Sequence, residues 1–138
     1  MSKHASQGVS CLDCHQPQKG QEPDRQDHNG FVITAHITPA NCRTCHQQIY
    51  QEFTRSRHAA PSWAAVYGEA ALTAEQVDFA EKLHPGYVKR PANALAKLEG
   101  PSAIAGGCAQ CHSIGKPQAD DTTGNCTACH TRHTSSVA

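Results

Sequence analysis

The sequence has 138 residues, of which 38% are hydrophobic and 5% aromatic, and its twelve basic side chains balance twelve acidic ones. This composition excludes two classes of protein. The sequence lacks the basic stripe interleaved with aromatic residues that would indicate a nucleic-acid-binding protein. It also lacks an apolar run as long as a membrane span. Eight prolines and ten glycines interrupt regular secondary structure along the chain. With few apolar residues as well, the chain fits one domain whose own hydrophobic core is poor.

Helical patterns are confined to the middle of the chain. The first predicted helix runs from about Cys42 through His58, with apolar residues at helical spacing, and ends before Pro61. The second begins at Thr73, where a Thr-Ala-Glu-Gln run fits a capping box, and ends before Pro85.

A third helix is predicted from Pro91 in the first helical position to Gly100, with Leu95 and Leu98 packed inward. Turn-forming and polar residues predict loops over residues 16–30 and 113–125. No segment shows the alternation that indicates a strand. The sequence thus predicts a mainly helical chain with much irregular backbone.

Four Cys-x-x-Cys-His motifs use all eight cysteines. They are Cys11-Cys14-His15, Cys42-Cys45-His46, Cys108-Cys111-His112 and Cys126-Cys129-His130. Each motif is typical of covalent haem c, in which two thiols form thioethers with the porphyrin and the histidine becomes an axial iron ligand. Paired cysteines also bind zinc, and eight cysteines could form four disulfides. Neither alternative explains the histidine after every second cysteine, so we predict four haem c groups.

Four haems in 138 residues leave about 35 residues for each macrocycle. We therefore expect a mainly α fold with extensive irregular loops, a small multihaem cytochrome c organised around four covalently bound haems. Residues 1–138 would form a single domain with a haem pair at 11–46, a helical connector at 47–107 and a second haem pair at 108–133. The chain without haem should be largely unfolded, and ionised propionates should make the holoprotein acidic by about four charges.

Six histidines lie outside the motifs, and four irons need four more axial ligands. Met1 is the only methionine, which favours low-potential bis-histidine centres. His84, before Pro85, should complement the dipole of a helix end or lie on the surface. His133 is too close to His130 to cap the same iron and should reach a neighbouring one. The candidate distal ligands are His4, His28, His36, His58 and His133.

The chain begins without the apolar stretch of a signal peptide. Since thioether attachment normally takes place outside the cytoplasm, we expect a mature product exported to the periplasm or the cell exterior.

Several stretches resemble the hydroxylamine oxidoreductase and octahaem cytochrome c family. They are residues 8–15 (GVSCLDCH), residues 36–42 (HITPANC), the run Ser56-Arg57-His58-Ala59, and the C-terminal motif pair, which ends in Cys-His-Thr-Arg-His. The similarity covers nearly the whole chain, weakly over residues 60–105, and implies a match to the second through fifth haems of that family. It implies that the haem of His112 corresponds to the catalytic one, which is open on its distal side.

Catalysis in that family relies on a cross-linking tyrosine and an Asp-His pair from later in the chain. This sequence stops eight residues after His130, and Tyr50, Tyr67 and Tyr87 do not occupy matching positions. We therefore do not expect hydroxylamine oxidation.

Residues 2–5 (SKHA) repeat the form of residues 56–59 (SRHA), but no haem motif precedes the first copy. His4 either folds back onto one of the chain's own irons or ligates a haem in a neighbouring subunit. The second option would join protomers head to tail, as in multihaem cytochromes that polymerise into extracellular conductive filaments.

The leading hypothesis is electron transfer through four closely packed haems, with redox proteins, identical subunits or an extracellular acceptor as partners. The alternative is a redox enzyme that acts on small nitrogen or sulfur oxyanions at a five-coordinate haem of His112. Lys89, Arg90 or Arg132 would then attract the anion. A haem-delivery or gas-binding module would also need an open iron, and without one we expect no enzyme activity.

Overall fold

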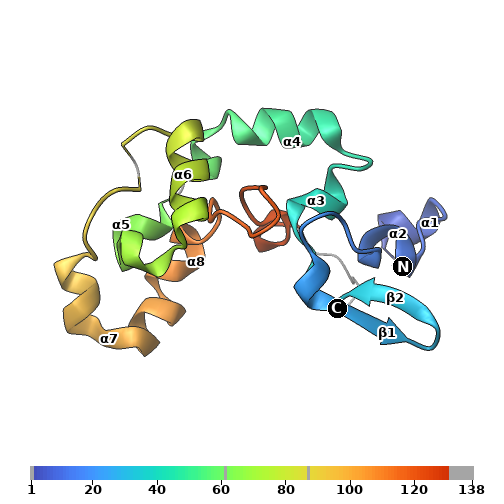
Figure 1. The fold of residues 1–138 in the computed structure, drawn as a ribbon, viewed down its shortest axis with the longest axis horizontal. Coiled ribbons are helices and arrows are strands. Elements are labelled where there is room, and N and C mark those ends of the chain that lie inside the picture. The colour runs from blue at the N-terminus through green and yellow to red at the C-terminus, as the bar shows by residue number, and fades with distance from the viewer. Residues whose placement is uncertain (1, 61, 87, 131–138) are drawn as a thin grey trace.

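The computed structural model describes residues 2–60, 62–86 and 88–130. Short helices and one β-hairpin are joined by loops, and Figure 1 shows two groups of elements with α4 running between them. The first group holds α1, α2, α3 and the hairpin, and the second holds α5 to α8. Within the described residues, no helix is long and apolar enough to cross a membrane.

Two capped helices begin the chain. Helix α1 (Lys3–Ser6) starts at Ser2, whose hydroxyl accepts a hydrogen bond from the Ala5 amide. Helix α2 (Cys11–His15) holds the whole first motif. Its capping box pairs Ser10 with Asp13 and satisfies amide groups that a helix start otherwise leaves without partners.

A hairpin begins inside the loop predicted over residues 16–30 and extends to residue 34, so the prediction of a loop over residues 25–30 and the expectation of no strands were wrong. After a 3₁₀ turn, η1 (Glu22–Asp24), strand β1 (Arg25–His28) pairs antiparallel with β2 (Phe31–Thr34). The connecting residues, Asn29 and Gly30, have φ of 54° and 83°. Positive φ at both positions defines the I′ turn that joins twisted strands, and Asn-Gly is its preferred sequence.

The first predicted helix is divided into three shorter pieces. Helix α3 (Pro39–Cys42) precedes the second motif, α4 (Gln47–Thr54) follows it, and a 3₁₀ turn, η2 (Arg57–Ala59), contains His58. His46 interrupts the helix with φ of −110° and ψ of 42°. Near the other end, the Thr54 and Ser56 hydroxyls donate to carbonyls three residues earlier, and such side-chain bonds compete with helix continuation.

The second predicted helix is confirmed. Helix α5 (Trp63–Tyr67) and the 3₁₀ turn η3 (Glu69–Ala71) lead to α6 (Ala74–Leu83). Thr73 and Gln76 form the expected capping box, and His84 is the C-cap residue. Ala80 of α6 packs with Ala64 and Val88 in a small buried cluster.

The third predicted helix begins later and is not packed as expected. Helix α7 (Ala94–Gly106) starts after Asn93, whose side chain accepts from the Leu95 amide and is a better N-cap than the residues before it. Gly100 breaks the helix with φ of 83°, and a second helical segment follows. Leu95 and Leu98 are 59% and 83% exposed, so they do not contribute to the core.

The C-terminal motif pair is joined by a loop that folds back on itself. Helix α8 (Cys108–His112) holds the third motif, and the 3₁₀ turn η4 (Cys126–Ala128) begins the fourth. Between them, Pro117 and Thr123 form an isolated antiparallel bridge. The described fold is therefore mainly helical with extensive loops, as predicted.

Candidate haem-binding sites

None of the eight motif cysteines forms a disulfide. Within residues 2–60, 62–86 and 88–130, no three His, Cys, Asp or Glu side chains gather as a metal-ion site. The described residues thus hold neither a preformed metal-ion cluster nor a disulfide, and the cysteine pairs fit the donor set for thioether attachment.

Two motif histidines are oriented by backbone carbonyls. His15 Nδ1 lies 2.8 Å from the Thr34 carbonyl oxygen at the end of β2, and His112 Nδ1 lies 3.1 Å from that of Ser62. A carbonyl oxygen only accepts, so Nδ1 carries the proton and Nε2 carries the lone pair. Metal-binding histidines in proteins are commonly held in this way. Both side chains therefore fit a proximal ligand.

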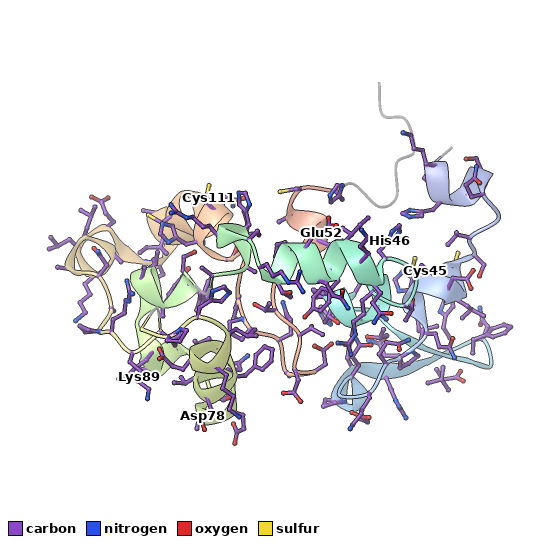
Figure 2. The ribbon with its side chains drawn as sticks, turned by 90° about the horizontal axis from the view of Figure 1, so that it is seen from above. Cys45, His46, Glu52, Asp78, Lys89 and Cys111 are labelled. Atoms are coloured by element: carbon purple, nitrogen blue, oxygen red, sulfur yellow. The ribbon has the colours of Figure 1, made fainter. Side chains whose placement is uncertain are left out.

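His4 lies against His46, the histidine of the second motif. The ring centroids are 6.0 Å apart, and the ring planes meet at 68°. When two imidazole rings bind opposite sides of one metal through bonds of about 2 Å, their centroids lie about 6 Å apart, because each centroid lies half a ring beyond the bonded nitrogen. A direct edge-to-face ring contact falls in the same range. The arrangement would therefore allow both histidines to bind one iron, and Figure 2 shows His46 beside Cys45.

The other candidate distal ligands are placed apart from one another. His28 is exposed at the end of β1, and His58 is exposed in η2. The His36 side chain is 85% exposed, with Nδ1 2.8 Å from Asp24 Oδ1. Hydrogen bonds from the Thr34 hydroxyl and from His36 hold the pKa of the Asp24 carboxyl well below its usual range. His133 lies outside the described residues.

Cysteine side chains of different motifs lie close enough to affect one another's pKa. Burial raises the pKa of the Cys14 thiol, and the nearby Asp13 and Cys45 raise it further. A hydrogen bond from Cys42 lowers the pKa of Cys126 to about 7. The first motif therefore lies beside the second, and the second lies beside the fourth.

The surroundings of His112 contain a cation that the sequence did not single out. Trp63 follows Ser62 and stacks on Tyr67 with centroids 3.9 Å apart. Lys116 Nζ lies 4.4 Å from the centre of the Trp63 ring, within the range of a cation–π interaction. Among the predicted anion-binding residues, Arg90 donates to the Gly86 carbonyl, Lys89 is exposed, and Arg132 lies outside the described residues.

Comparison with known families identifies the class of protein. A family profile described as cytochrome c552 matches residues 1–82, which include the first two motifs, His4 and α4. The chain belongs to the cytochrome c552 family. Members are multihaem c-type cytochromes with a redox role, so haem c is the cofactor of this chain. No curated protein and no solved structure shows significant similarity to the chain.

Family membership supports the haem assignment of the first two motifs but does not extend to the third and fourth. It accounts for the cysteine pairs at Cys11–Cys14 and Cys42–Cys45, which form no disulfide and lie inside the matched region. The third and fourth motifs lie beyond residue 82, so their assignment depends on the motifs themselves and on the His112 geometry. Figure 2 shows Cys111 in the part of the molecule remote from Cys45.

Proposed function

We propose that the chain is a tetrahaem cytochrome that transfers electrons between haems attached at its four motifs. His15, His46, His112 and His130 are the proximal ligands in this proposal, and the cysteines hold the porphyrins covalently. The His4–His46 pair is the observation that carries it, because an iron with two histidine ligands can change oxidation state without exchanging ligands. Export to the periplasm or the cell exterior belongs to the same proposal.

We assign His4 to the haem of His46 within one chain. The ring contact supports the folding-back option over ligation of a neighbouring subunit. A filament, if one forms, would then be joined by a different contact, for which His28 and His36 remain exposed candidates.

Replacement of His4 by alanine tests this assignment. The ferric holoprotein should gain a high-spin signal from about one haem in four, measured by electron paramagnetic resonance, with no change in size by light scattering. Lys3→Ala is the matched control and should leave the spectrum low-spin. Loss of a larger assembly together with the spectral change would instead support ligation between subunits, and an unchanged spectrum would remove His4 from the ligand set.

The second candidate function is a redox enzyme that acts on small nitrogen or sulfur oxyanions. The family comparison favours this candidate over a pure electron carrier, because the cytochrome c552 family includes a nitrite reductase. The candidate open haem is that of His112. Lys116, held over Trp63 near this histidine, supplies a positive charge that would attract an anion.

The ferric spectrum of the unmodified protein separates the two functions. An electron carrier should show only low-spin haem and should not bind carbon monoxide when reduced. The enzyme should show an open haem, bind carbon monoxide and consume nitrite with a reduced dye as donor. For the enzyme, Lys116→Gln should raise the KM for nitrite with little change in the carbon monoxide spectrum.

A further inference from the structure

A buried polar network joins the two motif pairs. Its centre is Asp120, which is 8% exposed and lies in the loop between the third and fourth motifs. The Asp120 carboxyl group accepts hydrogen bonds from the Thr38 hydroxyl, from Gln21 Nε2 at 3.3 Å, and from the amide and hydroxyl of Thr122. Residues almost a hundred positions apart in the sequence therefore meet at one side chain.

The same network reaches the first two motifs. Gln21 Nε2 also donates to Asn41 Oδ1 at 2.7 Å, and Asn41 directly precedes Cys42. The Asn41 amide in turn donates to the carbonyl of Gln16 at 3.1 Å, and Gln16 directly follows His15. A buried polar group that loses its partner keeps the cost of its removal from water, so the network strongly favours one relative position of these backbone segments.

Helix α4 makes a second connection to the same loop. The Thr123 amide donates to the Tyr50 hydroxyl at 3.3 Å. Gly124 lies so close to the Phe53 ring that a side-chain carbon there would overlap the ring. The second motif lies between α3 and α4, so the segments on both sides of it contact residues 120–124. That segment leads directly into Cys126, and Figure 1 shows it returning past α3.

We propose that the Asp120 network positions Cys42 against Cys126, so that the haems attached to the second and fourth motifs are direct neighbours. This junction would carry electrons between the N-terminal and C-terminal haem pairs. One electron crossing it would oxidise one iron from ferrous to ferric and reduce the other from ferric to ferrous, with no further reactant. The inference rests on the proposed haem attachment, and Asp120 acts as a positioning residue.

Nuclear magnetic resonance of the reduced holoprotein tests the junction without any mutation. Nuclear Overhauser effects are expected between the thioether protons at Cys42 and those at Cys126. If four haems are counted by mass and both sets of protons are assigned, the lack of such effects would overturn the junction alone. A count below four would instead overturn the proposed function.

Asp120→Asn tests the positioning role. The asparagine side chain has one oxygen acceptor fewer and points an N–H group at the groups that donate to Asp120. The network should therefore no longer hold the two motifs together, and the Overhauser effects and the excitonic circular-dichroism signal between neighbouring haems should be lost or reduced. Asp121→Asn is the matched control, because Asp121 is exposed at the adjacent position. A folded Asp120→Asn protein that has only a lower melting temperature and unchanged excitonic signal would show that Asp120 stabilises the fold without positioning the haems.

Discussion

Glu81 ties the end of α6 to the segment that follows. Its two carboxyl oxygens accept hydrogen bonds from the Gly86 amide at 3.0 Å and the Val88 amide at 3.1 Å. These hydrogen bonds, with the one from Gly86 as the larger cause, lower the pKa of Glu81 from its ordinary value of 4.5. Val88 is fully buried beside Ala64 and Ala80, so this single carboxyl group fixes the backbone that delivers Val88 to the core.

Glu81 should make the stability of the holoprotein depend on pH. Because its pKa is lower in the folded state, its contribution is complete above pH 4.5 and is lost as the pH falls through the folded value. Glu81→Gln should therefore lower the free energy of unfolding at pH 7, and the difference from the wild type should shrink below pH 4.5. Denaturant titrations at several pH values measure this. Glu99→Gln removes the same charge from α7, and an equal effect there would contradict the assignment.

At the scale of elements, two glycines with the same backbone conformation mark helix boundaries. Gly68, between α5 and η3, has φ of 78° and ψ of 167°, and Gly100, inside α7, has φ of 83° and ψ of 169°. Only glycine adopts this region readily. Their surroundings differ, because a side-chain carbon at Gly68 would lie 2.5 Å from the Ala92 amide nitrogen, whereas Gly100 faces open space.

Alanine at these two positions should separate backbone strain from packing. Gly100→Ala should cost about 1–3 kcal/mol from strain alone. Gly68→Ala should cost about 1–3 kcal/mol more, because the added carbon forces backbone atoms apart. Thermal unfolding of both holoproteins measures the difference, and equal losses would show that the close approach of Ala92 relaxes without cost.

The element boundaries show how far local signals extend. The capping box at Thr73 correctly predicted α6 because it depends on four neighbouring residues. The Asn29-Gly30 signal for a hairpin was also present in the sequence, but the short strands beside it lack clear alternation. The breaks at His46 and after Thr54 could not be predicted from apolar spacing, because they follow from turn geometry and side-chain bonds to the backbone.

For the whole molecule, the polypeptide supplies little apolar packing of its own. The main buried cluster in the described structure consists of Ala64, Ala80 and Val88, with Leu72 and Val77 beside it. Larger apolar side chains near the motifs are exposed, including Leu12 at 38% and Ile49 at 60%. Covalently attached porphyrin would supply the missing apolar surface.

The chain produced without haem attachment should therefore lack a cooperative unfolding transition. Its near-ultraviolet circular dichroism should be weak and its amide resonances poorly dispersed, whereas the holoprotein should melt cooperatively. Calorimetry of both forms gives the comparison. A cooperative transition in the haem-free chain would show that the polypeptide core and the Asp120 network suffice for folding.

The sequence by itself determined the class of cofactor and the candidate axial ligands. Each Cys-x-x-Cys-His motif is a local covalent unit, and the family comparison agrees with it over residues 1–82. The four-haem count, the single domain with its haem pairs at 11–46 and 108–133, and the assignment of every proximal and distal histidine stay predictions.

Only the tertiary structure decided which of these local units meet. It placed His4 beside His46, Lys116 over Trp63 near His112, and the loop around Asp120 against the segment that begins the second motif. These contacts join residues about 40 to 100 positions apart, and no local pattern encodes them. They depend on buried hydrogen bonds and ring contacts that form only when the whole chain has folded.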